Sequence, residues 1–276
     1  MTTAQKIIKL VANAFAIFLI VAIISGLLST GFSILGAIGV IDNKNELLED
    51  LKTISENNID EISSLKLDLK SSNLQIKTGE KFEVKTNNPS TEYTNTNGNI
   101  KIQDNNAKWH FGNNELATII IYLPENKTLD EITMNIGAGT ISSDTLEVQN
   151  LSLDLGAGNI TIENLIVSKN AKINGGAGNI NINSGKISNV DLDLGIGETN
   201  IKADITGKNK IDTGIGTLNL YLMSAQENYK LHIDKGVGHV KFNNDIISDN
   251  TDIGNGDNYI KINGGIGDIK IETKNL

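Results

Sequence analysis

One short pattern, repeated seven times between Ile132 and Ile271, constrains this chain more than any other feature of its sequence. Its clearest copy is Leu151–Ile162, and its general form is apolar-x-apolar-(Asp/Asn)-x-Gly-apolar-Gly-x-apolar-x-apolar. The intervals between the first glycines of successive copies are 19, 20, 19, 19, 22 and 29 residues. Those glycines are Gly137, Gly156, Gly176, Gly195, Gly214, Gly236 and Gly265. A nearly constant period of about 20 residues is typical of repeat architectures, in which each unit stacks on its neighbours.

Within a copy the apolar residues alternate with polar ones, as in Leu151/Leu153 and Ile160/Ile162. Alternation with a period of two indicates strands and not helices. Each copy therefore predicts two short strands that meet at Gly-apolar-Gly, with segments such as 163–165 leading to the next copy. We predict an all-β fold, a β-solenoid with coils of about 19–20 residues. An open-ended stack of strand pairs is the weaker alternative.

Two positions of the pattern predict the geometry of the corner. The residue two before the first glycine is always Asp or Asn, whose short side chain bonds nearby backbone, while glycine accepts a positive φ. The residue between the glycines is always apolar, and we expect it to point inward at the bend. The Asp/Asn residues are Asn135, Asp154, Asn174, Asp193, Asp212, Asp234 and Asn263. The apolar residues are Ala138, Ala157, Ala177, Ile196, Ile215, Val237 and Ile266.

Composition removes several functional classes. The formal net charge is −9 and no arginine is present, which argues against a basic nucleic-acid-binding surface and against bidentate phosphate recognition. The chain has no cysteine, so disulfides, thiol chemistry and thiolate metal sites are excluded.

The N-terminal region predicts a membrane anchor. Residues 10–41 are almost continuously apolar, which exceeds the roughly 20 residues that span a bilayer. Lys6 and Lys9 precede this segment and acidic residues follow it, so residues 1–9 should be cytoplasmic and everything after residue 41 extracellular. A cleaved signal peptide is the alternative, but its apolar region would be only about 7–15 residues long.

The rest of the chain divides into a linker and a repeat domain. Residues 42–64 keep helical spacing and predict a short helical linker or cap. The domain then covers residues 65–276, beginning with a degenerate copy in which Lys70 and Ser72 replace the glycines. Two insertions, residues 223–228 and 243–258, should be surface loops, and we regard them as candidate contact loops.

These residues carry a resemblance to a known family. The strand Ile119–Pro124, the repeated (Asp/Asn)-x-Gly-apolar-Gly pattern, the segment 229–238 and the closing segment 264–271 resemble the bacterial "putative adhesin" β-strand-repeat family, a domain of unknown function. The resemblance covers residues 65–276. It implies a β-solenoid-like domain on bacterial envelope proteins, often beside a membrane segment, with some relatives linked to envelope stress. It implies no catalytic residue.

Candidate chemistry is sparse. The segments 175–179 and 264–268 are similar to a calcium-binding nonapeptide, but Ile180 and Ile269 occupy its aspartate position. Asp193, Asp212 and Asp234 could form a row of carboxylates about 5 Å apart on successive coils, although use of this slot as a corner explains them better. The histidines are His110, His232 and His239, of which the last two occupy outward positions.

The sequence therefore predicts a non-enzymatic protein with no catalytic residue, cofactor or metal site. The expected function is a membrane-anchored interaction module, similar to an adhesin, that binds an envelope protein or a glycan through its repetitive surface. The alternative is a sensing or regulatory element of envelope stress that acts on a membrane partner.

Overall fold

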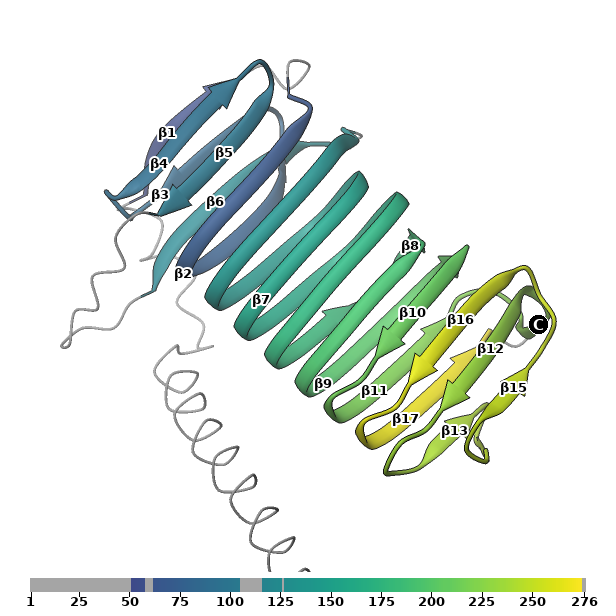
Figure 1. Cartoon of the computed structure of the whole chain (residues 1–276). Helices are drawn as coiled ribbons and strands as arrows, with labels where there is room; N and C mark the ends of the chain where they lie inside the picture. Colours follow the sequence, from purple (N-terminus) through teal and green to yellow (C-terminus); the bar gives the residue numbers. More distant parts are fainter. Residues whose placement is uncertain (1–50, 58–61, 105–115, 126, 275–276) are drawn as a thin grey trace, which may run out of the picture. The chain divides into compact units, whose positions relative to one another are not determined.

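The computed structural model describes residues 51–57, 62–104, 116–125 and 127–274, which belong to one compact unit (Figure 1). They are almost entirely strand, and the predicted β-solenoid is what these strands form. The strands are β1 (Lys52–Asn57), β2 (Ser64–Gly79), β3 (Phe82–Thr86), β4 (Thr91–Thr96), β5 (Asn99–Asp104), β6 (Ala117–Pro124), β7 (Leu129–Ile182), β8 (Gly185–Ser188), β9 (Val190–Thr206), β10 (Lys208–Asp212), β11 (Ile215–Leu222), β12 (Tyr229–Asp234), β13 (Val240–Phe242), β14 (Asp245–Ile246), β15 (Thr251–Ile253), β16 (Asn258–Asn263) and β17 (Ile266–Thr273).

A regular coil has three strand-paired sides. The sequence predicted the first two, which flank the Gly-apolar-Gly corner, and treated the intervening segments as connections. In the structure a connecting segment is also paired, because residues 165–167 of β7 run parallel to β8, and β8 runs parallel to residues 204–206 of β9. β7 extends over 54 residues because the chain turns its corners without leaving the parallel pairing.

The coils at the C-terminal end do not stack in the order of the sequence. β16 lies between β10 and β12 on one side of the coil, and β17 lies between β11 and β13 on the other. The last repeat is thus inserted between the two repeats that precede it. The insertion 243–258 contributes β14 and β15, which pair antiparallel with β13 and β12 and cover the outermost coil (Figure 1).

At the N-terminal end, the first long strand lies inside the stack and later strands lie outside it. β2 pairs in parallel with β7 on one edge and with β5 and β6 on the other, so β5 and β6 form the outer coil. The antiparallel strands β4 and β3 then cover β5 and β6. Antiparallel strands therefore cover both end coils of the parallel stack, where an open parallel edge would otherwise offer unpaired N–H and C=O groups to other chains.

The core is one continuous apolar cluster that runs through every coil. Within a coil the inward residues alternate as the sequence predicted: Leu151 and Leu153 are buried before the corner, and Ile160 and Ile162 after it. Because neighbouring coils stack in register, each buried aliphatic side chain lies above another one, and no coil could bury these side chains alone.

Rows of asparagine bind the coils together outside the core. Asn219 donates through Nδ2 to Asn200 Oδ1 over 2.8 Å, and Asn200 donates to Asn181 over 2.9 Å. Such amide rows form only when identical positions of successive coils lie at the spacing of hydrogen-bonded strands. They therefore fix the register of the stack.

The predicted helical linker is wrong where the structure describes it. Residues 52–57 form β1, which pairs antiparallel with β3, and Ile54 packs against the core. The apolar residues have helical spacing, but the free edge of β3 offers unpaired backbone groups. Pairing with that edge favours a strand at residues 52–57. The predicted anchor, residues 10–41, lies outside the described residues. In the described ranges no helix is long and apolar enough to cross a membrane.

The corner glycines give a stability prediction. A Cβ at Gly178 would lie 1.6 Å from the carbonyl oxygen of Gly158, and the φ of Gly178 is +143°. We expect Gly178→Ala to lower the free energy of unfolding by at least about 2 kcal/mol, because neither backbone can move without breaking the stack. Chemical denaturation followed by circular dichroism measures this loss.

The control is Gly175→Ala in the same corner. The only close contact of a Cβ there would be the terminal Cδ1 of Ile180, at 2.7 Å, and a side-chain methyl group can rotate away; the next atoms lie at 3.6 Å or more. We expect a change within about 1 kcal/mol. Equal effects of the two substitutions would show that close approach of the backbones is not what requires glycine at this corner.

Candidate functional site

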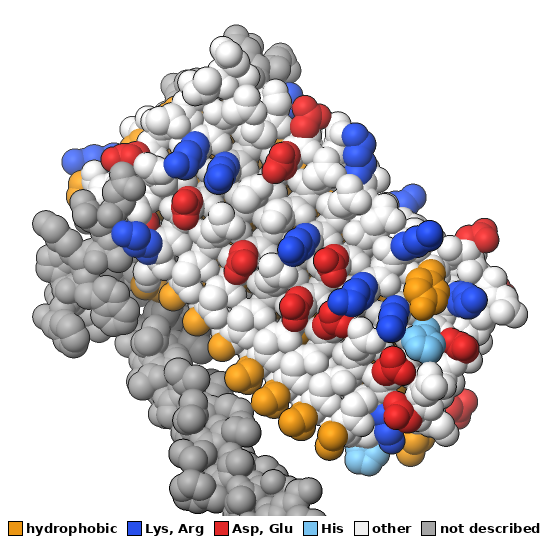
Figure 2. Space-filling model, in the orientation of Figure 1, with side chains coloured by type: hydrophobic (Ala, Val, Ile, Leu, Met, Phe, Trp, Pro, Cys, Tyr) orange, Lys and Arg blue, Asp and Glu red, His pale blue; other side chains and the backbone are white. Residues whose placement is uncertain are grey.

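The apolar residues between the corner glycines point outward, not inward as the sequence predicted. None is buried, and Val237 and Ile266 are 69% and 56% exposed. Together they form a row along one edge of the solenoid, which we call the corner ridge (Figure 2). Its members are Ala138, Ala157, Ala177, Ile196, Ile215, Ile266 and Val237.

The corner itself explains this direction. In the coil of Ala157, the interior behind the bend is already filled by Leu155 and Ile160, which are buried on either side of it. Four residues separate these two, so the alternation must slip by one position at the corner, and the middle side chain turns to solvent. Buried positions are usually apolar, but an apolar residue need not be buried, since many apolar side chains remain at protein surfaces.

Glycines flank every member of the ridge because successive backbones touch there. A Cβ at Gly158 would lie 1.7 Å from Gly139 O, and one at Gly267 would lie 1.7 Å from Gly216 O. The ridge side chains consequently stand above two smooth columns of exposed backbone, with no side chain on either side. This arrangement gives another molecule close access to the ridge.

The ridge changes in size along its length. Strand pairing places Ala177 beside Ile196, Ile196 beside Ile215, Ile215 beside Ile266, and Ile266 beside Val237. At the other end, Ser71 of the degenerate first repeat lies beside Ala138. The spatial order is Ser71, Ala138, Ala157, Ala177, Ile196, Ile215, Ile266 and Val237. Half of the row is therefore small and the other half is β-branched.

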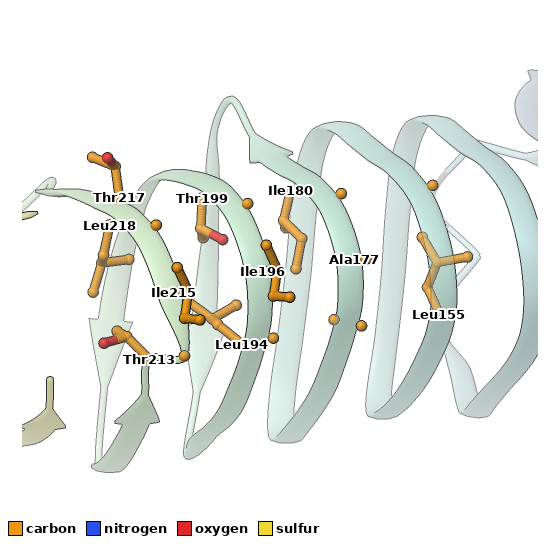
Figure 3. A pocket seen from close by; sticks show the side chains of 18 residues that line it. Leu155, Ala177, Ile180, Leu194, Ile196, Thr199, Thr213, Ile215, Thr217 and Leu218 are labelled. Atoms are coloured by element: carbon orange, nitrogen blue, oxygen red, sulfur yellow. The ribbon is translucent and has the colours of Figure 1, made fainter. Parts of the chain in front are cut away.

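A small hollow lies at the middle of this corner (Figure 3). Its volume is about 20 Å³, and the inner residues Ile180, Leu194, Thr199 and Thr213 line it together with the ridge. Such a volume holds about one water molecule. The residue just before the first corner glycine is leucine in two coils, at Leu155 and Leu194. In neighbouring coils it is the smaller Gly175 or Thr213, and this loss of side-chain volume leaves the hollow. The hollow is too small for a ligand and leaves the ridge as the accessible feature.

The row of corner carboxylates does not form as the sequence allowed. Asp212 lies beside Asp193, but Asn263 separates Asp212 from Asp234 because the last repeat is inserted there. Asn263 donates to Asp212, and Lys210 forms an ion pair with it. Burial raises the pKa of Asp212, but the hydrogen bonds from Lys210 and Asn263 outweigh it and hold that pKa below its usual value.

Side chains at this slot bond to neighbouring coils, as Asn174 does to Asp154, in addition to any role at their own corner. The described residues contain no cluster of three or more His, Asp or Glu side chains arranged to hold a metal ion.

The two described histidines occupy outward positions, as predicted, and each faces a carboxylate. His232 Nδ1 lies 2.8 Å from Asp252 Oδ1, and His239 Nδ1 lies 3.3 Å from Asp268 Oδ1. The backbone N–H of His239 also donates to Asp268, and these contacts hold the pKa of Asp268 below its usual value. They attach the terminal coil and β15 to the stack. His110 lies outside the described residues.

The predicted contact loops differ from each other. Residues 226–228 form an exposed single turn of 3₁₀ helix, as expected of a surface loop. Residues 243–258, in contrast, contain the two covering strands, so their first role is structural. Ile246 in β14 is nevertheless 72% exposed.

A second hollow, of about 280 Å³, is lined mainly by polar residues between Glu131 and Asp191. Asn150, Asn170 and Asn189 contribute to it, together with Glu131 and Lys172. The amides are engaged within the fold: Asn170 donates to Asn150, Asn150 to the carbonyl of Asp130, and Asn189 to the carbonyl of Lys169. We therefore regard this row as a structural feature and the ridge as the candidate site.

Comparison with known proteins places the fold in a family. Residues 62–274 match the Toastrack DUF4097 family. The chain belongs to this family. The resemblance identified from the glycine pattern is thereby confirmed, and the family is a domain of unknown function.

A search of solved structures found similar chains in two further organisms. One is described as a putative adhesin from Bacteroides fragilis, with 14% identity, a TM-score of 0.51, and coverage of 81% of this chain and 97% of that one. A second is described as a putative cell adhesion protein from Clostridium sporogenes, with 18% identity, a TM-score of 0.37, and coverage of 81% and 99%. No curated protein matches the sequence. At 14% identity and a TM-score of 0.51, the Bacteroides fragilis structure supports the fold alone.

The Lys210–Asp212 pair predicts a dependence of stability on pH. Because the pKa of Asp212 is lowered in the folded chain, the carboxylate stabilises the fold above the unfolded value, near 4, and loses this effect as the pH falls through the folded value. We expect Asp212→Asn to lower the melting temperature by a few degrees at pH 6, and the difference from wild type to shrink below about pH 4.

Asp193→Asn is the matched control, since Asp193 occupies the same slot one coil away and makes no ion pair within the described residues. A difference from wild type that is the same at every pH would contradict the assigned role of Asp212.

Proposed function

We propose that this protein is a non-enzymatic interaction module of the cell envelope. In this proposal residues 10–41 anchor it in the membrane, and the solenoid lies outside the cell. The observation that supports an interaction role is the corner ridge: an unbroken apolar row with large exposed side chains at Ile266 and Val237. Soluble proteins rarely leave such rows exposed unless another molecule covers them.

The fold supports the same reading. The ridge is made by stacked, hydrogen-bonded coils, so its side chains are held in a fixed line and lose little conformational freedom when a partner binds. The polar faces on either side carry alternating lysine and carboxylate residues, such as Lys210 with Asp212 and Lys270 with Glu272. These charges keep the rest of the surface hydrated and confine association to the ridge.

The names of structural neighbours agree with this proposal, since both are described as adhesion proteins. An adhesin-like role requires a surface that binds other molecules, and it requires no catalytic residue. His232 and His239 bond to Asp252 and Asp268, and Asn263 bonds to Asp212, so these side chains link neighbouring strands.

Site-specific photo-cross-linking in intact cells tests the proposal. A photoreactive side chain at position 215 or 266 should form covalent adducts with another protein, because these ridge positions contact the partner. The same side chain at Lys202, which is exposed on the second side of the coil, is the control. Adducts of equal yield at all three positions, or none from the ridge, would count against a binding role for the ridge.

Ile266→Lys provides a matched variant. Because Ile266 is more than half exposed, we expect the unfolding free energy to stay within about 0.5 kcal/mol of wild type. Adduct formation from position 215 should nevertheless fall, since a charge on the ridge must be desolvated by the partner. An unchanged adduct yield would show that the partner contacts another surface.

The anchor has its own test. Deletion of residues 10–41 should transfer the protein from the membrane fraction to the soluble fraction, and protease added to intact cells lacking a wall should digest the solenoid of the undeleted chain. Full protection from protease in intact cells, together with digestion after lysis, would reverse the proposed orientation.

A further inference from the structure

The size order of the corner ridge is self-complementary. With Ser71 of the first repeat added, the row has eight positions. They run from small residues at the N-terminal end to β-branched residues at the C-terminal end, and the change falls between Ala177 and Ile196, at the middle of the row. If a second copy lies antiparallel along the first, every small residue faces a large one. The facing pairs are Ser71 with Val237, Ala138 with Ile266, Ala157 with Ile215, and Ala177 with Ile196.

The geometry points to a second copy of this chain as the molecule that covers the ridge, in an antiparallel two-fold arrangement. This inference rests on the proposed function and names its partner. A two-fold axis between Ala177 and Ile196 makes the interface isologous, so one row supplies both surfaces. A parallel arrangement would instead place large against large and small against small, which leaves gaps at one end and overlaps at the other.

Three features of the ridge fit this partner. Both copies have the same coil spacing, about 4.8 Å, so facing positions stay in register along a row of about 34 Å. The glycines that flank the alanines let the isoleucines of one copy reach the backbone of the other. Close approach over small residues brings more atoms of the two copies within van der Waals distance.

The contact is one row wide, which limits its strength. A single line of side chains buries less than the roughly 1,200 Å² of a stable interface. We therefore expect the isolated solenoid to be monomeric at micromolar concentration, and pairing to occur where an anchor raises the local concentration. The full-length chain in its membrane is the form to test.

The absence of native cysteine allows a direct experiment, because introduced cysteines are the only thiols. Two differently tagged full-length chains, one with Ala138→Cys and one with Ile266→Cys, are co-expressed and treated with a short thiol cross-linker in membranes. We expect cross-linking between the two variants. Ile266→Cys alone should not cross-link to itself, since these residues would lie five coils, about 24 Å, apart along the axis. Lys202→Cys in both chains is the background control.

A size swap distinguishes a specific contact from proximity in the membrane. With the cysteine pair retained, Ala157→Ile should place isoleucine against Ile215 of the other copy and lower the cross-linked fraction about tenfold. Adding Ile215→Ala to the other chain restores one small and one large residue at each contact, and cross-linking should recover. Circular dichroism of each variant checks that the fold tolerates the change at Ala157, which is exposed, and at Ile215, which is half-buried.

The outcomes separate this inference from the proposed function. Cross-linking of Ile266→Cys to itself would show a parallel pair, and absence of any ridge cross-link above the Lys202→Cys background would show no pair; either result overturns the inference. If photo-cross-linking from position 215 yields another protein while no copies pair, the interaction module stands and its partner is different. Protection of the ridge cysteines from a water-soluble maleimide, without thiol cross-links and without photo-adducts to another protein, would indicate lipid as the covering surface, and would also overturn the inference.

Discussion

Close contact between successive backbones at the Gly-apolar-Gly corner is the constraint on which the rest of this structure depends. The Cβ of any other residue at Gly139, Gly158 or Gly178 would overlap the carbonyl group of the coil before it. Because the corner cannot open, the coils remain at the spacing of hydrogen-bonded strands on every side. The stacked aliphatic core, the amide rows and the straight corner ridge all require that spacing.

The same constraint creates the surface that we propose as functional. Glycines on both sides prevent any side chain from covering the middle residue, and the filled interior prevents that residue from turning inward. An apolar residue at this position therefore remains exposed or half-buried in each coil, and the row lengthens with each repeat. The change from alanine to isoleucine along the row is independent of the corner geometry, since Ala177 and Ile196 occupy equivalent corners.

Parallel stacking leaves an open strand edge at each end of the solenoid. At both ends the coils depart from the order of the sequence, and inserted strands cover the open edge. At each end an antiparallel pair of strands lies between two parallel coils in the sequence and covers the outer coil in space. The long interval between the last two glycines is the length of chain that this detour requires. Closed ends limit uncontrolled strand addition, and this leaves the ridge as the exposed apolar feature along the described stack.

The sequence by itself determined the repeat period, the two strands around each corner, the positions that need glycine, and the family to which the chain belongs. These follow from local rules: alternation reports one buried face, and a conserved slot beside glycine reports a turn. Tertiary structure alone decided the order of the coils, the outward direction of Ile196 and Ile215, and the pairing of residues 52–57 with β3. Each of these depends on which backbone or side chain already fills the neighbouring space, and the residues that fill it are distant in the sequence.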